Sequence, residues 1–474
     1  MVEYFTFFFG LSLLITLTNS IEDDNDKKYL IFPFKRNLTS SKSMTPEQFF
    51  ITEIYNQIYI NMFVGSNKQN IPFYLYLQQY PTVLQSSNAK KGEVKGIYNE
   101  LKSNTYKKLS EKVVEFEKGD LVKGILSEDT FYFNSTSSSI KFYLSVENYG
   151  DSHITEGGKL GFRYFNEYNE SLESNFVIKL KNLGKISSYD IAILYDSNKL
   201  DDDNGKLLIG ALPHEVYNQA YNKSDIKSAN SNTYGLWEIY FQKIALGNEI
   251  FDRQNGALFY PEFGFIVGSY NFFDLLNILA NWSEIFNSSK CHSYQFQITD
   301  MEANDITRFL FWYTGYYCEK DVNVDNIINE SLTFTSTDFA YEFKLNNKDI
   351  WMEKNGYKYF LILKTLNIEN AWILGRPFFK RFHMNFNLDS KNMIVYPNVN
   401  FVNKPPDNEI NYISVYTLII SSLILIIGVL AFFLYRNYIY APRKKRANEL
   451  VDDDFEYKGG NTQEENKIIP GEGN

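Results

Sequence analysis

Residues 372–396 constrain the fold of this chain more than any other stretch. They begin with the apolar triplet Trp-Ile-Leu at 372–374, which Gly375 ends, and continue through a short aromatic segment into two apolar runs. Apolar residues alternate with polar ones from Phe382 to Leu388, which predicts a strand with one buried face. The polar residues at 389–392 predict a tight turn. On periodicity alone, the stretch is a single turn of helix followed by a buried β-hairpin.

The chain is long enough for two or three ordinary domains or one large bilobal domain, with 474 residues. Aromatic residues make up 17% of it, which favours β-rich structure around a large core. The net charge of -10 argues against a nucleic-acid partner. The sparse, unclustered cysteines and histidines argue against a structural zinc site and a histidine-dependent triad, and we expect no cofactor. The histidines are His153, His214, His292 and His383.

The N-terminal residues 1–20 have the pattern of a signal peptide. A run rich in Phe and Leu from Tyr4 to Leu17 is followed by small residues at Thr18 and Ser20. The segment before this run contains Glu3 and no Lys or Arg, which is atypical. The acidic polar stretch that follows directly still favours a signal peptide over a buried helix.

Residues 411–435 have the pattern of a membrane-spanning helix. They carry no charge, are rich in Ile, Leu and Val, and are long enough to cross a bilayer. Arg436 and the basic run at 443–446 follow, and such a flank predicts a cytosolic side. With a cleavable signal, the sequence predicts a type I single-pass membrane protein with a disordered cytosolic tail at 436–474.

The acceptor sequons for N-glycosylation agree with this topology, because all of them precede the span. They place the large domain in the lumen of the secretory or endolysosomal pathway or at the cell surface. The acceptors are Asn37, Asn134, Asn169, Asn222, Asn281, Asn287 and Asn329.

The order of parts around residues 372–396 resembles the end of the C-terminal lobe of pepsin-like aspartic proteases, peptidase family A1. There, Trp-Ile-Leu-Gly-Asp precedes a helical turn and the last hairpin, and Arg376 replaces that Asp as a small departure. The resemblance extends from residue 59 to 396. It implies a mainly β, bilobal fold with few short helices, an N-terminal lobe at 46–225 and a C-terminal lobe at 226–400.

The segment at 21–45 resembles the prosegment of that family. Residues 29–36 (Tyr-Leu-Ile-Phe-Pro-Phe-Lys-Arg) read as one apolar strand with a basic end. This strand is either the opening strand of a prosegment or the first strand of the domain, and no legible cleavage site separates the two interpretations.

The same alignment puts tyrosines where the family has its two catalytic aspartates. Counted from Gln69, Tyr76 takes the first position, and aligned on Val267, Tyr260 takes the second. Aspartic proteolysis needs one carboxylate from each lobe, close enough to share a proton. A phenol with a pKa of about 10 cannot replace the carboxylate base. The resemblance therefore implies a catalytic dyad that does not function.

The residues beside the two tyrosines also differ from the family. Leu77 and Pro261 replace the threonines that brace the loops, and Gln78 and Glu262 replace the glycines. No Asp-Thr-Gly or Asp-Ser-Gly occurs in the chain. Glu262 is the one acid in either signature, and we expect it to be a solvated loop residue.

Three further features follow from the resemblance. Glu117 takes the place of the tyrosine at the tip of the flap, the hairpin that closes over substrate. Cys291 and Cys318 are expected to form one disulfide, as the family's C-terminal lobe commonly has. Ser269 is expected to cap a helix whose apolar residues share one face, at 272, 275, 276 and 279.

The leading functional hypothesis is a non-catalytic, membrane-anchored pseudoprotease that binds a peptide or protein in its interlobe cleft. The alternative is an active aspartic endopeptidase with an atypical site. A third interpretation is a membrane-tethered surface or sorting protein whose cleft is closed. Residues 464–469 (Glu-Glu-Asn-Lys-Ile-Ile) resemble an acidic dileucine sorting signal, although such a short pattern also arises easily by chance.

Overall fold

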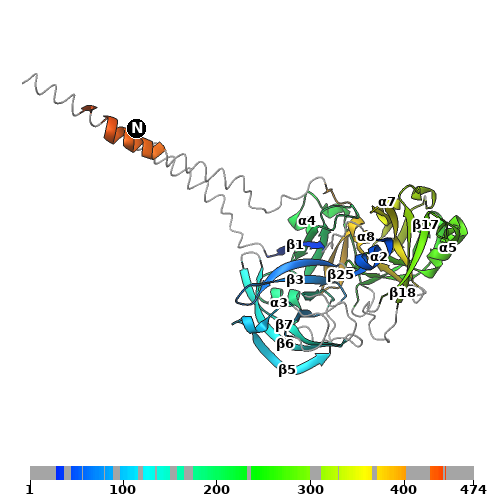
Figure 1. The fold of residues 1–474 in the computed structure, drawn as a ribbon, viewed down its shortest axis with the longest axis horizontal. Coiled ribbons are helices and arrows are strands. Elements are labelled where there is room, and N and C mark those ends of the chain that lie inside the picture. The colour runs from blue at the N-terminus through cyan, green and yellow to red at the C-terminus, as the bar shows by residue number, and fades with distance from the viewer. Residues whose placement is uncertain are drawn as a thin grey trace, which may run out of the picture. The chain divides into compact units, whose positions relative to one another are not determined.

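The computed structural model describes residues 28–36, 44–55, 57–78, 81–88, 97–115, 121–133, 136–149, 157–164, 174–231, 236–298, 311–328, 330–365, 371–401, 428–440 and 443–444. The chain divides into two compact units, Met1–Pro405 and Pro406–Asn474. Strands dominate the described part of the first unit, which confirms the mainly β expectation (Figure 1). The predicted signal peptide at 1–20 lies outside the described residues.

The largest sheet among the described residues combines strands from both halves of the chain. Its centre holds β1, which pairs with β10 on one side and with β2 on the other. In spatial order the strands are β11 (Lys227–Asn230), β25 (Asn392–Tyr396), β24 (His383–Asn387), β9 (Asp190–Tyr195), β10 (Gly205–Ile209), β1 (Leu30–Arg36), β2 (Ile58–Val64), β3 (Gln69–Tyr76), β8 (Gly158–Gly161), β4 (Thr82–Gln85), β7 (Thr136–Tyr149), β6 (Leu121–Phe133) and β5 (Lys107–Glu115).

Two further sheets belong to the second half of the chain. One contains β12 (Glu238–Phe241), β15 (Asn255–Phe259), β23 (Ala371–Leu374), β16 (Ile266–Gly268), β22 (Tyr357–Thr365), β18 (Phe311–Glu319) and β17 (Cys291–Ile298), with β21 (Trp351–Lys354) paired to β22. The other contains β14 (Glu249–Asp252), β13 (Lys243–Leu246), β19 (Leu332–Ser336) and β20 (Tyr341–Leu345).

The two halves repeat one pattern of strand pairing. In the first half, β3 is parallel to β8, β8 is antiparallel to β4, and β4 is parallel to β7. In the second half, β15 is parallel to β23, β23 is antiparallel to β16, and β16 is parallel to β22. The two halves of the described chain therefore share one order of parallel and antiparallel pairs, and each half is called a lobe below.

Short helices connect and cover the strands. The α-helices are α2 (Pro46–Tyr55), α3 (Phe176–Asn182), α4 (Pro213–Val216), α5 (Tyr270–Ala280), α6 (Trp282–Ile285), α7 (Asn347–Ile350) and α8 (Arg376–Arg381). Single 3₁₀ turns occur at Glu100–Lys102, Lys223–Asp225 and Val324–Asn326. Ser269 caps α5 as expected, because its side chain accepts a hydrogen bond from the Phe272 amide. Leu279 was expected on the buried face of α5 but is 53% exposed.

The hairpin predicted at the end of the domain is present as β24 and β25, after the helical turn α8. The four apolar side chains expected on its buried face are fully buried. The expectation of a single buried face was wrong, because His383 and Asn385 on the opposite face are fully buried too. Residues from the α4 region cover that second face, and the Tyr221 hydroxyl lies 2.7 Å from His383 Nδ1.

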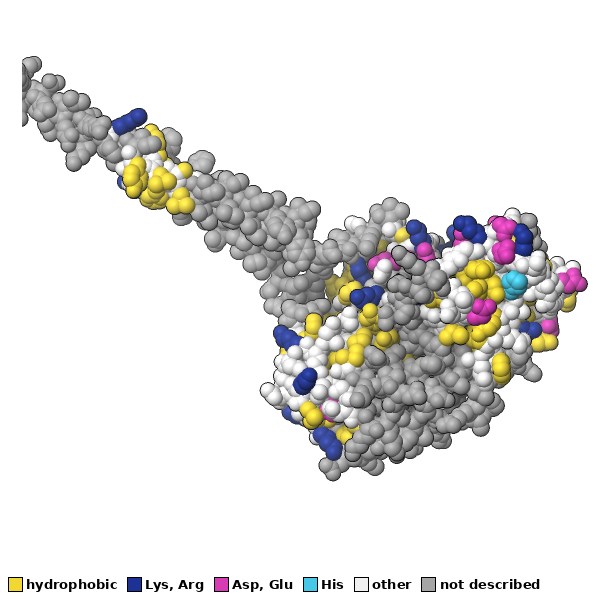
Figure 2. Space-filling view, in the orientation of Figure 1, with side chains coloured by type: hydrophobic (Ala, Val, Ile, Leu, Met, Phe, Trp, Pro, Cys, Tyr) yellow, Lys and Arg dark blue, Asp and Glu magenta, His cyan; other side chains and the backbone are white. Residues whose placement is uncertain are grey.

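The second unit is described over residues 428–440 and 443–444, which are helical and include a π-helical turn at Tyr435–Tyr440. Its large apolar side chains are at least 47% exposed, and hydrophobic atoms cover the face seen in Figure 2. Among the described residues, no helix is both long enough and apolar enough to span a bilayer. Residues 411–427 of the predicted span lie outside them.

Candidate functional site

Tyr76 and Tyr260 end equivalent strands in the two lobes. Tyr76 is the last residue of β3 and pairs with Gly161 of β8, and its carbonyl accepts a 2.9 Å hydrogen bond from the Phe162 amide. Tyr260 follows β15 directly, and its amide donates to the Leu374 carbonyl of β23 at 3.0 Å. Both tyrosines therefore begin the loop that leaves the first strand of the repeated motif.

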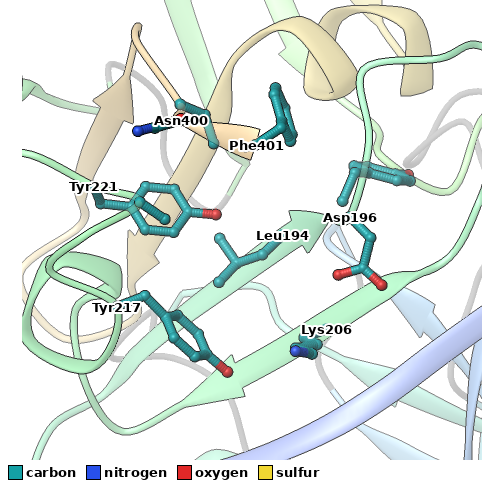
Figure 3. Close-up of a pocket in the computed structure, with 10 residues that line it drawn as sticks. Leu194, Asp196, Lys206, Tyr217, Tyr221, Asn400 and Phe401 are labelled. Atoms are coloured by element: carbon teal, nitrogen blue, oxygen red, sulfur yellow. The ribbon is translucent and has the colours of Figure 1, made fainter. Parts of the chain in front are cut away.

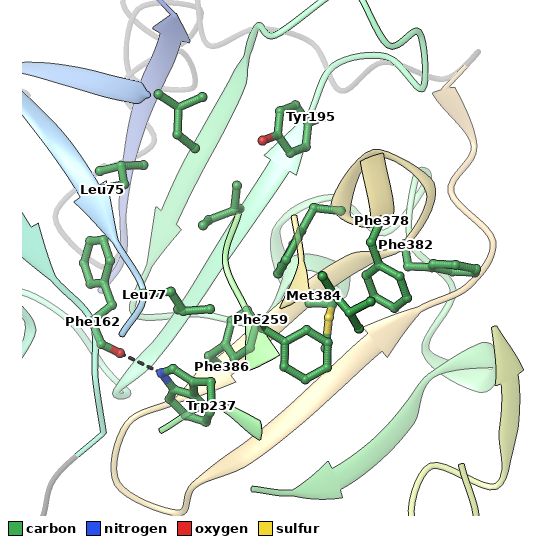
Figure 4. Packing of buried hydrophobic residues seen from close by; sticks show 14 of the residues in the cluster. Leu75, Leu77, Phe162, Tyr195, Trp237, Phe259, Phe378, Phe382, Met384 and Phe386 are labelled. Carbon is green, nitrogen blue, oxygen red and sulfur yellow. Dashed lines mark hydrogen bonds between the residues drawn. The ribbon is translucent and has the colours of Figure 1, made fainter. Parts of the chain in front are cut away.

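The two loops meet through the side chain of Gln78. Its amide nitrogen donates to the carbonyls of Trp237 and Phe259, at 3.1 and 2.9 Å, and its oxygen accepts from the Trp237 amide at 2.9 Å. The Trp237 indole in turn donates to the Phe162 carbonyl, the bond drawn in Figure 4. Three side-chain hydrogen bonds from one buried glutamine thus tie the first loop to the strand that leads into the second.

Two protein groups contact the Tyr76 side chain, one at its hydroxyl and one at its ring. It is only 8% exposed, and its hydroxyl donates a 2.6 Å hydrogen bond to Oε1 of Gln57. The ammonium group of Lys159 lies 4.9 Å from the centre of its ring, within cation–π range. Lys159, on the neighbouring strand β8, therefore makes a specific contact with the Tyr76 ring.

Tyr260 lies in a different environment, at the edge of an aromatic cluster. It is partly buried and packs against the core group that contains Phe49, Phe263 and Phe265. Phe49 belongs to α2, so the N-terminal helix contributes to the surroundings of the second tyrosine. The part of the chain just before β2 therefore contacts the surroundings of both tyrosines: Gln57 bonds to Tyr76, and Phe49 of α2 belongs to the cluster beside Tyr260.

A group of buried charges, which we call the ion cluster, lies directly behind the Tyr260 loop. Arg36 bonds to both Glu53 and Asp203, and Arg376 reaches the same two carboxylates at 3.2 and 3.4 Å. Lys380 completes the cluster with a 2.6 Å contact to Asp203. All five side chains are at most 6% exposed.

The ion cluster corrects the interpretation of Arg376 as a small departure from the family motif. Its guanidinium group also donates to the backbone carbonyl of Glu53 at 2.8 Å, and its backbone amide donates to the Phe263 carbonyl at 2.7 Å. A Cβ added to Gly264 would lie 2.3 Å from that Glu53 carbonyl and 2.5 Å from Arg376 Nη2. The close approach of the loop to α2 therefore requires glycine at 264.

The electrostatics of the cluster keep its carboxylates ionised. Burial raises the pKa of Asp203, but Arg376, Lys380 and Arg36 outweigh this effect and hold the pKa at about 2. Burial likewise raises the pKa of Glu53, and Arg36 and Arg376 reverse it, so that its pKa lies below the usual value. Carboxylates held this way accept ion pairs and do not donate protons near neutral or mildly acidic pH.

Glu262 was expected to be a solvated loop acid, and this expectation was wrong. It is 5% exposed, and its charge acts on the Tyr195 phenol, whose pKa is raised chiefly by burial. The loop folds inward at this point because Tyr260 accepts a 2.9 Å hydrogen bond from the Phe263 amide. A turn of this kind carries the intervening residues toward the protein interior.

A separate shallow pocket lies elsewhere on the first unit (Figure 3). The register that pairs Leu194 with Lys206 puts these two lining residues side by side on β9 and β10. None of the residues predicted for the site lies in it. The lining consists of Leu194, Tyr195, Asp196, Lys206, Tyr217, Ala220, Tyr221, Val399, Asn400 and Phe401.

The remaining predicted residues fall into two groups. The Cys291–Cys318 disulfide is present between β17 and β18, as expected, with an S–S distance of 2.03 Å. Asn222, Asn281 and Asn287 are exposed. Outside the described residues lie the flap residue Glu117 and the sequons at Asn37, Asn134, Asn169 and Asn329.

The N-terminal helix is the part of the site that sequence reasoning missed. Its signal was present: Thr45 and Gln48 exchange backbone-to-side-chain hydrogen bonds, as in a capping box, and Pro46 opens the helix. The described residues contain no group of three His, Cys, Asp or Glu side chains placed to hold a metal ion.

Comparison with known families agrees with this architecture. Residues 62–261 match the family model described as eukaryotic aspartyl protease, and the matched stretch includes both Tyr76 and Tyr260. No curated protein was found to match the chain. The chain therefore contains an aspartyl protease-like domain over the matched residues.

Proposed function

We propose that this protein is a membrane-anchored, non-catalytic member of the aspartyl protease family that binds a peptide or protein segment between its lobes. The observation that carries the proposal is the equivalent position of the two tyrosines. Tyr76 is the last residue of β3, and Tyr260 directly follows the equivalent strand β15. In an active enzyme of this type, each of the two loops supplies a carboxylate, and the pair shares one proton.

The acids that lie near these loops do not offer a replacement pair. The cations of the ion cluster neutralise Glu53 and Asp203 and hold the pKa of both below its usual value, so both are ionised near neutral pH. Glu262 is buried in the second loop, and the first described loop contributes Leu77 and Gln78 after Tyr76. Among the described residues of these two loops, a general acid–base mechanism has no second carboxylate.

The location that we propose rests on the sequence pattern and on the exposed helix of the second unit. The uncharged residues 411–435 form the span, and the basic residues at 443–446 lie on its cytosolic side. The helical residues 429–435 expose most of their large apolar side chains, which suits a lipid environment. The domain then faces the lumen or the cell exterior and carries N-glycans and a disulfide.

The test is an activity measurement on the purified lumenal domain, residues 21–405, against a mixture of denatured proteins between pH 3 and 7. We expect no cleavage that pepstatin abolishes. The double variant Tyr76→Asp/Tyr260→Asp is expected to remain inactive, because Gln78 and Glu262 still occupy positions where the family has glycine. Pepstatin-sensitive cleavage by the unaltered domain would overturn the proposal.

The second candidate is an active aspartic endopeptidase with an atypical site, which the family match itself favours. Glu262 is the residue that such a mechanism would have to use. If cleavage is observed, Glu262→Gln should abolish it, whereas Glu249→Gln on exposed β14 should leave it unchanged.

A further inference from the structure

We infer that residues 46–57 are the resident occupant of the lobe junction, where Arg376 holds them against the two tyrosine-bearing loops. This inference rests on the proposed binding function, since it names the segment with which any other ligand must compete. The segment comprises α2 and the short connection that ends at Gln57, directly before β2.

The sequence of α2 is that of a helix with one apolar face. Pro46, Phe49, Phe50, Glu53 and Ile54 are buried, a spacing of three, one, three and one that follows a single helix face. Gln48 and Ile51 on the opposite side are exposed. The helix therefore presents two aromatic anchors and one carboxylate to whatever it covers.

The sheet of the second lobe contains a matching surface for the two aromatic anchors. Phe49 stacks on Tyr359 of β22 with ring centres 3.7 Å apart, and Phe50 lies 5.7 Å from Phe265. A Cβ added to Gly315 of β18 would come within 2.4 Å of the Phe50 ring. Gly315 thus leaves the space that the second anchor fills, so this surface is shaped for this helix.

The carboxylate of Glu53 is the polar counterpart of those anchors. It is 6% exposed and receives Arg36, Arg376 and, at 3.4 Å, the partly exposed Lys354. A buried carboxylate persists only when cations and hydrogen bonds replace its lost hydration. Arg376 contributes most specifically, because it bonds both the side chain and the backbone carbonyl of Glu53.

The same short segment reaches both loops. Its Glu53 carbonyl lies against Gly264, four residues after Tyr260, and its Gln57 side chain accepts the hydrogen bond from the Tyr76 hydroxyl. A ligand that contacts both tyrosines must therefore displace the segment or copy its chemistry. The chemistry it would have to copy is an amphipathic helix with two adjacent aromatic residues and an acid three positions later.

The first experiment measures backbone amide exchange in the complete lumenal domain. In the unaltered protein, amides of residues 49–55 should exchange as slowly as those of β22, because both belong to one packed unit. Exchange as fast as in exposed loops would overturn the inference. Lys354→Met should speed exchange of this segment about threefold, since it removes one partly exposed ion pair. The matched control is Lys320→Met, which removes the exposed pair with Glu353 and should leave the segment unchanged.

The second experiment uses a fluorescent peptide with the sequence of residues 44–57 as the probe. The junction is open only when the resident segment has left, so the apparent affinity for the probe should rise by the same factor as the amide exchange rate. Arg376→Met should increase both the amide exchange rate and the apparent affinity for the probe by at least tenfold on this two-state argument. If Arg376→Met does not fold, Lys354→Met provides the same comparison. Faster exchange without tighter binding would overturn the inference, as would tight binding to the unaltered domain. Proteolytic activity would refute the proposed function alone, since the exchange measurement does not depend on it.

Discussion

Gln78 joins the two lobes through hydrogen bonds to backbone groups of Trp237 and Phe259. The family resemblance assigned the bracing of these loops to threonines, and Leu77 and Pro261 stand in their places. The structure supplies the brace one residue later, from an amide side chain that bonds both the Trp237 amide and two carbonyls. An amide can serve here because it donates and accepts at the same time.

Replacing Gln78 with leucine should destabilise the domain by about 2–4 kcal/mol, because it removes three buried hydrogen bonds, including the one that the Trp237 amide donates to the side chain. Chemical denaturation of the lumenal domain measures this change. The control is Gln297→Leu, at an exposed position of β17, which should alter stability by less than about 0.5 kcal/mol. Equal effects of the two substitutions would contradict the role given to the Gln78 bridge.

His383 should make the domain sensitive to mild acid. Burial lowers its pKa to about 3, below the usual value near 6.5, so the folded state excludes a proton that the unfolded state takes up. The stability that depends on neutral His383 is present above pH 6.5 and is lost as the pH falls toward 3. Asp203, whose pKa is about 2, adds its own loss only below about pH 4.

Between pH 6.5 and 4.5, the unaltered domain should therefore lose about 2 kcal/mol more stability than the variant His383→Phe. Denaturation midpoints at several pH values report the difference. His292→Phe on β17, a partly exposed position, should keep the pH dependence of the unaltered protein. Parallel curves for the unaltered domain and His383→Phe would show that this histidine is accessible to protons in the fold.

The burial of two charged residues, Arg376 and Glu262, could not be predicted from the sequence. The motif positions of Arg376 and Glu262 were legible, but their burial was not, because it depends on partners more than a hundred residues away. Arg376 pairs with Glu53 and Asp203, and no local pattern connects these three. Charged residues in loops are usually solvated, so a buried one is recognised only when its counter-ions are known.

At the scale of elements, α2 links the N-terminal part of the chain to the sheet of the second lobe. Phe50→Ala should cost about 3–5 kcal/mol, since it removes a fully buried ring from a close-packed site over Gly315. Ile51→Ala, on the same helix but 42% exposed, should cost less than about 1 kcal/mol. Thermal unfolding of both variants checks the comparison, and similar losses would mean that α2 is not packed through this face.

The elements with strong local sequence patterns were predictable, but the helix α2 was not predicted although its pattern was also regular. The alternation of apolar and polar residues and the polar turn predicted the β24–β25 hairpin. The N-cap residue and the apolar spacing predicted α5. The pattern of α2 was equally regular, but the sequence yielded no expectation of a helix for these residues. The second buried face of β24 was hidden for a different reason: His383 and Asn385 are polar and are buried by tertiary partners.

At the scale of the whole molecule, the repeated strand motif gives the two halves of the described chain the same order of parallel and antiparallel pairs. In the second half, the apolar triplet before Gly375 lies in β23, the strand parallel to β15. The interlocking of the lobes could not be anticipated, because β24 and β25 complete a sheet that begins with strands of the first half. Such long-range pairing leaves no periodic trace in either segment.

The C-terminal tail provides a test of where the molecule acts. Residues 464–469, which lie outside the described part of the chain, place an acid four positions before a pair of isoleucines. If the proposed topology places this tail in the cytosol, the pattern suits an adaptor with an apolar pocket and a basic rim, so both the acid and the isoleucines should matter. Ile468→Ala/Ile469→Ala should shift the steady-state distribution of the full-length protein toward the cell surface, measured by surface biotinylation. Glu464→Gln should produce a smaller shift in the same direction, and Glu449→Gln, nearer the membrane, should produce none. An unchanged distribution in the double isoleucine variant would leave the tail without a sorting role, and the location of the protein would then be set by its lumenal domain and its span.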